Sequence, residues 1–264
     1  VIMAYKISEN SDIRLPVIIN LDGFYLSFTR EPVSVPDKDN VTAYLGEYNP
    51  LKDRYSSRTP QARGIIVLGG AQYSYFRYQT HLACMKALDV YKTASAEFES
   101  LFGRHYPVVE TYCFDDAEYC FIMTGSFSTK AKSAVDSLRK AGWKIGLIRP
   151  RLIRPFPSQE LRELLHGIKG AAIIDQNISF GKGGILYTEI TSSLYGAKGD
   201  YPVIGSFIGG LGGRDITIDE FCQIAEEIKY YVKKGEQPEA RLLFTAAELE
   251  QIKKVQSIAG TDNE

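Results

Sequence analysis

Short apolar runs alternate with helix-length segments along most of this sequence, and that alternation constrains the fold more than any other feature. Four runs are predicted as buried strands, at residues 119–124, 143–148, 170–175 and 201–207. Helices are predicted after them, at 128–141, from Ser158 onward, at 183–194 and at 217–234. Strands joined through helices pair in parallel and need helices on both faces of the sheet. The pattern therefore predicts an α/β fold, a three-layer αβα domain with a mostly parallel sheet.

The first residues indicate part of another domain. Residues 1–10 have an amphipathic helical pattern, and the apolar, β-branched run at 15–21 stops at Asp22-Gly23. A strand that is buried on both faces of a parallel sheet has this composition. Residues 1–33 are therefore expected to be the C-terminal end of an earlier domain.

Residues 34–62 are predicted as a linker, because they contain three prolines and no helical or strand periodicity. A connection of this length is unusual inside a compact domain, which favours a segment that lies on a neighbouring subunit. The α/β domain is expected to span residues 63–236. Residues 237–264 are expected to form a C-terminal appendage with a helix at 246–257.

The tyrosine-rich stretch at 72–78 has two interpretations. Tyrosines bury a large area while keeping a polar tip, which suits a contact with another subunit. The same residues can also form the first turns of the helix predicted at 80–102, which carries an apolar stripe and ends at Gly103. The sequence alone favours neither interpretation.

Charge and hydropathy exclude several classes of function. The net charge is −1 at pH 7, so the basic excess of a nucleic-acid-binding surface is missing. No run approaches the roughly 18 apolar residues of a membrane-spanning helix, and no signal-peptide pattern is present. The chain is therefore expected in the cytoplasm, with no nucleic-acid and no membrane partner.

The cysteines and histidines do not form a recognisable metal motif. The four cysteines lack Cys-x-x-Cys spacing, and the three histidines do not pair on one element. Free, mostly buried thiols are favoured over cluster ligation, which needs thiolates grouped closely in sequence. No metal site is predicted in this chain, and any iron–sulfur clusters would belong to another polypeptide.

The turn after the strand at 119–124 is the best candidate for an anion site. Free N–H groups and the dipole at a helix N-terminus hold phosphate or carboxylate groups. The residues at this point are Gly125, Ser126, Ser128 and Thr129. The same small residues can serve only to turn the chain and cap the helix, which is the favoured interpretation. The glycines do not match Gly-x-Gly-x-x-Gly, so a nicotinamide dinucleotide is not expected.

Arg149, Arg151 and Arg154 form a short, rigid basic corner between prolines. Guanidinium groups this close need acidic compensation, either from carboxylates of the protein or from the phosphate of a cofactor. The acidic residues of the 115–118 segment are the expected partners in a structural ion-pair network. Arg154 remains a candidate for cofactor binding.

Two glycine-rich loops follow the later strands. The loop at 179–185 is not a phosphate loop, because its lysine is followed by glycine and not by serine or threonine. In the loop at 209–215, Arg214 and Asp215 are expected to pair locally, and a turn or interface role is favoured over cofactor contact. No Ser/His/Asp set and no convincing carboxylate pair is evident, so no catalytic residue is predicted.

The order of short motifs along the chain resembles the alpha subunit of the 2-oxoacid:ferredoxin oxidoreductases, of the pyruvate:ferredoxin oxidoreductase type. The resemblance extends from residue 1 to about residue 230. The motifs are Leu21-Asp-Gly-Phe24, Glu31-Pro32, Arg77-Tyr-Gln79, Phe102-Gly-Arg104, Asp116-Ala-Glu118, Gly125-Ser126, Val135-Asp-Ser-Leu-Arg139, Arg154-Pro-Phe-Pro157, Asp175 with Ser179-Phe-Gly181, and Arg214-Asp215.

The resemblance implies two domains and a reaction. Residues 1–33 would end a domain that contacts the thiamine pyrimidine, and residues 63–236 would be similar to the C-terminal domain of transketolase. The implied reaction is the oxidative decarboxylation of a 2-oxoacid, with electrons passing to ferredoxin. This segment would serve mainly as scaffold and subunit interface.

The resemblance also implies cofactors and partners for the whole complex. Thiamine diphosphate, Mg²⁺ and 4Fe-4S clusters would be bound there, none of them wholly within this chain. Beta-, gamma- and delta-type subunits would be partners, and coenzyme A is a further candidate. Residues 55–60 and 69–75 differ from what pyruvate enzymes usually show. Oxalate or a branched 2-oxoacid is therefore an alternative to pyruvate.

Two other classes of function compete with the enzyme subunit. The glycine turns at the strand ends would suit a flavin- or nucleotide-binding electron-transfer module. The lack of an acid/base set would suit a purely structural domain for subunit assembly.

Overall fold

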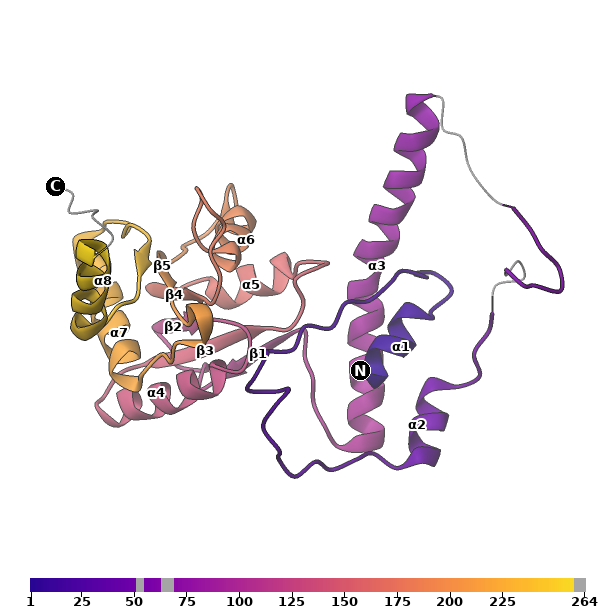
Figure 1. Ribbon diagram of the computed structural model, residues 1–264, viewed down its shortest axis with the longest axis horizontal. Helices are drawn as coiled ribbons and strands as arrows, with labels where there is room; N and C mark the ends of the chain where they lie inside the picture. The colour runs from indigo at the N-terminus through magenta and orange to yellow at the C-terminus, as the bar shows by residue number, and fades with distance from the viewer. Residues whose placement is uncertain (51–54, 63–68, 259–264) are drawn as a thin grey trace. The chain divides into compact units, whose positions relative to one another are not determined.

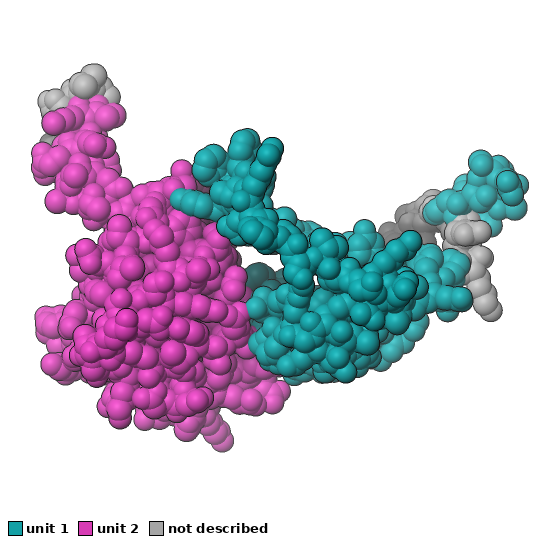
Figure 2. Space-filling model, turned by 90° about the horizontal axis from the view of Figure 1, so that it is seen from below, with its two compact units in different colours: residues 1–108, 151–157 teal, residues 109–150, 158–264 magenta. Residues whose placement is uncertain are grey.

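The structure is a computed structural model that describes residues 1–50, 55–62 and 69–258. The chain forms two compact units (Figure 2). Unit 1 comprises residues 1–108 and 151–157, and unit 2 comprises residues 109–150 and 158–264. None of the described helices is long and apolar enough to cross a lipid bilayer.

Unit 2 is built on a six-stranded sheet with the strand order β1-β3-β2-β4-β5-β6. The strands are Val109–Tyr112 (β1), Tyr119–Ile122 (β2), Ile145–Pro150 (β3), Gly170–Asp175 (β4), Val203–Ile208 (β5) and Arg241–Leu242 (β6). β2 to β6 run parallel, and β1 pairs antiparallel with β3. The predicted α/β class with a mostly parallel sheet is confirmed.

Helices cover both faces of this sheet and complete three layers (Figure 1). The helices of unit 2 are Ser128–Lys140 (α4), Ser158–Leu165 (α5), Ile185–Leu194 (α6), Ile218–Lys234 (α7) and Ala246–Ile258 (α8). α4 packs beside α7 on one face, and α5 packs beside α6 on the other. Each of these helices lies within a few residues of its predicted bounds.

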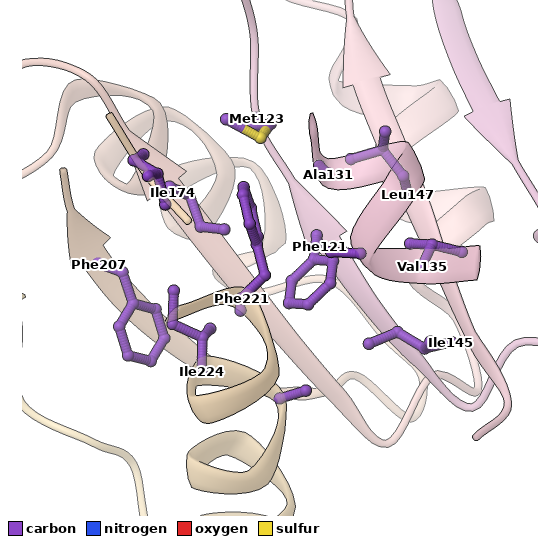
Figure 3. Close-up of a cluster of buried hydrophobic side chains, with 14 of the residues drawn as sticks. Phe121, Met123, Ala131, Val135, Ile145, Leu147, Ile174, Phe207, Phe221 and Ile224 are labelled. Atoms are coloured by element: carbon purple, nitrogen blue, oxygen red, sulfur yellow. The ribbon is translucent and has the colours of Figure 1, made fainter. Parts of the chain in front are cut away.

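The core between the sheet and the α4–α7 layer is aromatic and aliphatic (Figure 3). Phe121 of β2 and Phe221 of α7 are fully buried and meet edge to face, with ring centroids 5.4 Å apart. Val135 and Leu138 lie three residues apart on α4 and turn the same helix side toward the sheet. Burial of one such side chain stabilises a fold by about 1.5–3 kcal/mol. This core therefore fixes the positions of α4 and α7.

The described part of unit 1 contains the helices Ile2–Ser8 (α1), Lys38–Leu45 (α2) and Gly70–Phe102 (α3). α1 and α2 pack against the C-terminal half of α3. Ile7 of α1 clusters with Ala94 of α3. Tyr44 of α2 meets Phe98 edge to face at 5.3 Å between ring centroids, and its hydroxyl donates to the carbonyl oxygen of Ala94 at 2.8 Å.

The run at 15–21 is not a buried strand, and that expectation was wrong. The structure assigns no strand there, and Ile18 and Leu21 are 84% and 68% exposed. A buried strand needs neighbours that pair its backbone and cover its side chains. The described residues of unit 1 provide no strand to pair with this run. The role of residues 1–33 as the end of a thiamine pyrimidine-binding-type domain stays a prediction.

Two helices also differ from expectation. Residues 38–45 of the predicted linker form α2. Asp37 is its N-cap, and the Asp37 carboxylate accepts the N–H groups of Asp39 and Asn40. α3 begins at Gly70, well before its predicted start, and so contains the tyrosine-rich stretch. These tyrosines do form the first turns of the helix, but they are exposed, and their contact with another subunit stays a prediction.

The predicted domain at 63–236 does not coincide with either unit. Its first residues, 63–68, lie outside the described residues, and α3 packs with α1 and α2 in unit 1. The mostly parallel sheet and the helix layers of unit 2 are those expected for the sheet-containing part, whereas β1 and β6 were not predicted. The four domain boundaries and the likeness to the C-terminal domain of transketolase stay predictions.

Candidate functional site

The carboxyl edge of the sheet is the usual ligand position in an open α/β fold. β2 lies between β3 and β4. The chain leaves β2 toward α4 on one face and leaves β4 toward α6 on the opposite face. Loops that diverge in this way mark the topological switch point, where such folds bind their ligands. Residues 123–127 and 176–184 therefore frame the candidate site.

The turn between β2 and α4 is closed by its own hydrogen bonds. Gly125 adopts a φ of 80°, which few other residues tolerate. The fully buried Ser128 hydroxyl donates to the Gly125 carbonyl oxygen at 2.6 Å. The Thr129 N–H donates to the Ser126 carbonyl oxygen at 3.0 Å. These bonds suit a tight turn that starts a helix, and anion binding by these residues stays a prediction.

Arg149 is compensated by Glu110 and not by the predicted acidic partners. Antiparallel pairing of β1 with β3 places Glu110 directly opposite Arg149. The Arg149 Nη1 lies 3.5 Å from the Glu110 Oε2, and the Arg149 Nη2 donates to the Gly125 carbonyl oxygen at 3.4 Å. Lys132 of α4 contacts the other oxygen of Glu110 at 2.6 Å. The carboxylate of Glu110 thus joins β1, β3 and α4 beside the turn.

The acidic residues of the 115–118 segment pair elsewhere, so their predicted contact with the basic corner was wrong. Asp116 accepts from Arg139 at 2.7 Å, and Glu118 pairs with Lys144 and Lys169. These ion pairs lie at the amino-end side of β2, away from its carboxyl end. The reason is positional, because the segment precedes β2 whereas Arg149 lies near the end of the neighbouring parallel strand.

Arg154 does not belong to the same unit as the turn at Gly125. It lies in the segment 151–157, which is part of unit 1. Its side chain is exposed, its Nη1 donates to the Ile153 carbonyl oxygen at 2.6 Å, and its peptide bond to Pro155 is cis. Arg151 of the same segment lies over the Tyr106 ring, 5.1 Å from its centroid. A cofactor role for Arg154 stays a prediction.

Arg214, in the loop after β5, joins the starts of two helices. The Arg214 Nη2 donates to Glu220 at 2.6 Å and to Glu248 at 2.8 Å. Glu220 forms a capping box with Thr217 at the start of α7, and Glu248 exchanges equivalent bonds with Thr245 at the start of α8. The expected local pair of Arg214 with Asp215 was wrong, because Asp215 pairs with Lys130 of α4.

The contacts of Arg214 change the ionisation of both carboxylates. Hydrogen bonds from Arg214 and then from Thr245 lower the pKa of Glu248 to about 2. Burial alone would raise the pKa of Glu220, but hydrogen bonds from Arg214 and Thr217 outweigh it and lower this pKa. Both carboxylates therefore stay ionised near neutral pH, and the hydrogen bonds that Arg214 donates to Glu248 raise the pKa of Arg214. The cluster holds the glycine-rich loop against α7 and α8.

Asp175, at the end of β4, fixes the second loop of the site. Asp175 is 2% exposed, and its carboxylate accepts the N–H groups of Leu186 at 2.8 Å and Tyr187 at 3.1 Å. These bonds cap the first turn of α6. Burial raises the pKa of Asp175, and these hydrogen bonds oppose the rise. A Cβ atom on Gly184 would lie 2.0 Å from the Asp175 Oδ2. Asp175 belongs to one of the short motifs of the sequence, but the motif does not reveal this capping role.

Charged side chains of the candidate site are already paired within the chain. No three His, Cys, Asp or Glu side chains among the described residues are grouped to hold a metal ion. Arg149 already pairs with Glu110. Burial raises the pKa of the Cys120 thiol, so it is a poor thiolate ligand. We therefore assign no chemical step to these residues.

Comparison with known proteins gives consistent matches along the chain. Residues 1–99 match the family described as "Pyruvate flavodoxin/ferredoxin oxidoreductase, thiamine diP-bdg". Residues 117–221 match "Pyruvate:ferredoxin oxidoreductase core domain II". The two matches follow one another in the order of units 1 and 2.

Individual relatives give the same result. The chain is 36% identical to the pyruvate synthase subunit PorA of Pyrococcus abyssi over 235 residues, and 39% identical to the ketoisovalerate oxidoreductase subunit VorA of Pyrococcus horikoshii over 236 residues. Each alignment covers 89% of this chain and 59% of the relative. PorA of Thermotoga maritima is 38% identical over 86% of this chain and 57% of its own length. The chain thus spans less than two thirds of these relatives.

Proposed function

Because this chain belongs to the family of 2-oxoacid:ferredoxin oxidoreductase alpha subunits, we propose that it forms part of the alpha subunit of such an enzyme. The enzyme would oxidatively decarboxylate a 2-oxoacid with thiamine diphosphate and pass the electrons through iron–sulfur clusters to ferredoxin. The observation that carries this proposal is the ordered match of two family descriptions along one chain, together with 36–39% identity over most of its length.

We propose pyruvate, oxalate or another 2-oxoacid as the substrate, with a branched 2-oxoacid as a specific candidate. Relatives named for pyruvate and for ketoisovalerate match this chain almost equally well, at 36% and 39% identity. Overall similarity therefore does not discriminate between the two acids. The residues that differ from pyruvate enzymes, at 55–60 and 69–75, support the search for other substrates.

We propose that this segment acts mainly as scaffold and subunit interface. Three basic side chains near the sheet edge are neutralised by carboxylates of the chain itself. They are Lys130, Arg149 and Arg214. Ser128 and Asp175 are used to close turns and start helices. The binding of thiamine diphosphate, Mg²⁺ and clusters would then depend on residues beyond those described, in a complex with other subunits. A cytoplasmic location remains a prediction.

The composition of the native complex tests this function. The complex that contains this chain should be purified without oxygen, and its thiamine diphosphate, iron and sulfide contents and absorption spectrum measured. The proposal predicts bound thiamine diphosphate and broad iron–sulfur absorption. A flavin spectrum without thiamine would support the electron-transfer module instead. A complex with neither cofactor would support a purely structural role.

A further inference from the structure

The helix α8 exposes nearly all of its side chains. Among the side chains at 246–256, only that of Glu248 is not exposed. The apolar residues Leu249 and Ile252 remain 44% and 38% exposed, so they are not packed into a core. Figure 2 shows α8 as the magenta arm that projects from unit 2 at the upper left. The chain just before α8 is anchored, because Leu243 is buried in the core. Glu248 is therefore the main described contact of α8 itself with unit 2.

The contact that holds Glu248 is a bidentate pair with Arg214. The Arg214 Nη2 donates to the Glu248 Oε2 at 2.8 Å, and the Arg214 Nε donates to the Glu248 Oε1. Two parallel N–H···O bonds are the geometry in which a guanidinium binds carboxylates in general. Arg214 thus holds Glu248 as it would hold the carboxylate of a separate molecule.

Arg214 is positioned by contacts that do not involve α8. Its Nη2 also donates to Glu220 at 2.6 Å. Glu220 is buried, and hydrogen bonds with Thr217 fix it at the start of α7. The Arg214 Nη1 is buried and has no acceptor among the described residues, so one more donor is available to an occupant. The guanidinium would therefore stay oriented for a carboxylate after α8 has moved away.

The pair of Arg214 with Glu248 lies at the edge of the sheet where ligands are expected. Arg214 belongs to the loop after β5, and open α/β folds bind ligands beyond the carboxyl ends of their strands. Gly212 and Gly213 adopt φ values of 66° and 83°, and a Cβ atom on either would meet nothing within 4 Å. The described residues therefore leave the loop uncovered next to Arg214, where a small molecule can approach.

The order of α8 depends on the same carboxylate. A helix of 13 residues is marginal in water when little packs against it. Glu248 accepts the Thr245 N–H, and its own N–H donates to the Thr245 hydroxyl. One carboxylate thus both caps α8 and attaches it to Arg214. An anion that takes the place of Glu248 on Arg214 would therefore release the helix.

We propose that α8 is a latch, in which Glu248 occupies a carboxylate-binding site formed by Arg214, and that a small external carboxylate competes for this site and releases the helix. A carboxylate is the expected class of ligand because the present occupant is one. Binding of the ligand and closure of the latch exclude each other, so each weakens the other by the same factor. The inference does not depend on the proposed function, because both partners belong to this chain.

Hydrogen–deuterium exchange of the complex that contains this chain tests the latch. We expect Glu248→Gln to speed exchange of the α8 amides by about tenfold or more, while α7 keeps its wild-type exchange. Glutamine still fits a capping box, so the helix start is preserved and the charged pair is lost. The matched control is Glu250→Gln, because Glu250 pairs with Lys253 of the same helix at 3.6 Å. The control should leave exchange unchanged.

The carboxylate site is tested by the same measurement with sodium acetate as the probe. A site with a dissociation constant of about 0.1 M would speed α8 exchange about threefold at about 0.2 M acetate, relative to sodium chloride at equal ionic strength. In Glu248→Gln the latch is already open, so acetate should add nothing. Arg214→Lys should also release α8 and lose the response to acetate, because an ammonium group cannot form the two parallel bonds.

Other results would contradict the inference. Unchanged α8 exchange in Glu248→Gln would show that the pair does not hold the helix. Exchange of wild-type α8 at the rate of an unfolded segment would show that the latch is never closed. An equal response to acetate in wild type and Glu248→Gln would mean that acetate acts elsewhere. Sodium phosphate that acts more strongly than acetate would contradict a carboxylate as the class of ligand. Failure to oxidise any 2-oxoacid would affect the proposed function and none of these results.

Discussion

The guanidinium of Arg214 donates hydrogen bonds to Glu220 at the start of α7 and to Glu248 at the start of α8. Replacement by alanine would leave Glu220, which is 8% exposed, without its cationic partner. Loss of a partner for a buried polar group costs about 1–3 kcal/mol. We therefore expect Arg214→Ala to lower the free energy of unfolding by about that amount, measured by urea denaturation of the full chain.

Arg241 offers the control for this prediction. Its side chain is 43% exposed and pairs with Glu227 at 3.1 Å. Exposed ion pairs contribute about 0–1 kcal/mol, so Arg241→Ala should change stability much less. Equal losses for the two variants would show that Arg214 acts as an ordinary surface charge.

Position 184 requires glycine because a larger side chain has no space there, and not because of the backbone conformation. Its φ of −68° suits any residue, yet a Cβ atom would lie 2.0 Å from the Asp175 Oδ2. Gly184→Ala must therefore displace a buried carboxylate that starts α6, and overpacking of this kind costs about 1–3 kcal/mol. Thermal unfolding should show the loss, whereas Gly70→Ala, with nothing within 4 Å, should be neutral or slightly stabilising. An unchanged melting temperature for Gly184→Ala would contradict the close approach.

Among the elements, the start of α7 is specified by a capping box that can be read from the sequence. The Thr217 hydroxyl accepts the Glu220 N–H at 3.2 Å, and the Glu220 carboxylate accepts the Thr217 N–H at 2.9 Å. Removal of such a cap costs about 1 kcal/mol. Thr217→Ala should therefore lower the melting temperature by about 2–4 °C, and Thr217→Ser should retain most of the stability. If serine and alanine destabilise equally, the hydroxyl is not the cause.

The parallel strands and their helices could be predicted from the sequence, because each signal is local. Val135 and Leu138 have helical spacing, Thr217 caps α7, and the apolar run at 170–174 suits a central strand. The run at 15–21 has an equally clear strand pattern but lacks a pairing strand among the described residues. Local pattern alone could not show that. α2 escaped prediction because its signal, the Asp37 cap, is a single residue in a polar stretch.

The contacts of the candidate site could be predicted only in part. The small residues at 125–129 predicted both the turn at Gly125 and the helix that begins at Ser128. The pairs Arg149–Glu110 and Arg214–Glu248 could not be predicted, because they join residues that are distant in sequence. The first depends on the missed strand β1, which is only four residues long, and the second on the docking of α8.

For the whole molecule, the ion pairs predict how stability depends on pH. The folded pKa of Glu248 is about 2, below its ordinary value of 4.5, and those of Asp116, Glu118 and Glu220 are also lowered. A carboxylate with a lowered folded pKa stabilises the fold above its unfolded pKa, and this contribution is lost as the pH falls toward the folded pKa. Asp175, with a raised pKa, acts in the opposite sense.

Stability should therefore decline as the pH falls below about 4.5, and the difference between wild type and Arg214→Ala should shrink over the same range. Urea denaturation of both proteins at a series of pH values measures this difference. A difference that stays constant down to the lowest pH at which both proteins fold would show that ionised Glu220 and Glu248 do not contribute through Arg214.

We propose that this chain works within a thiamine-dependent 2-oxoacid oxidoreductase, as its similarity to alpha subunits of such enzymes suggests. The most direct test is anaerobic reduction of a low-potential dye by the purified complex, with pyruvate, oxalate, 2-oxoglutarate and 2-oxoisovalerate offered separately. We expect reduction with at least one of these acids, lost when thiamine diphosphate is removed and restored when it is returned with Mg²⁺. A complex that retains its thiamine and iron but reduces the dye with none of the four acids would contradict the proposed function.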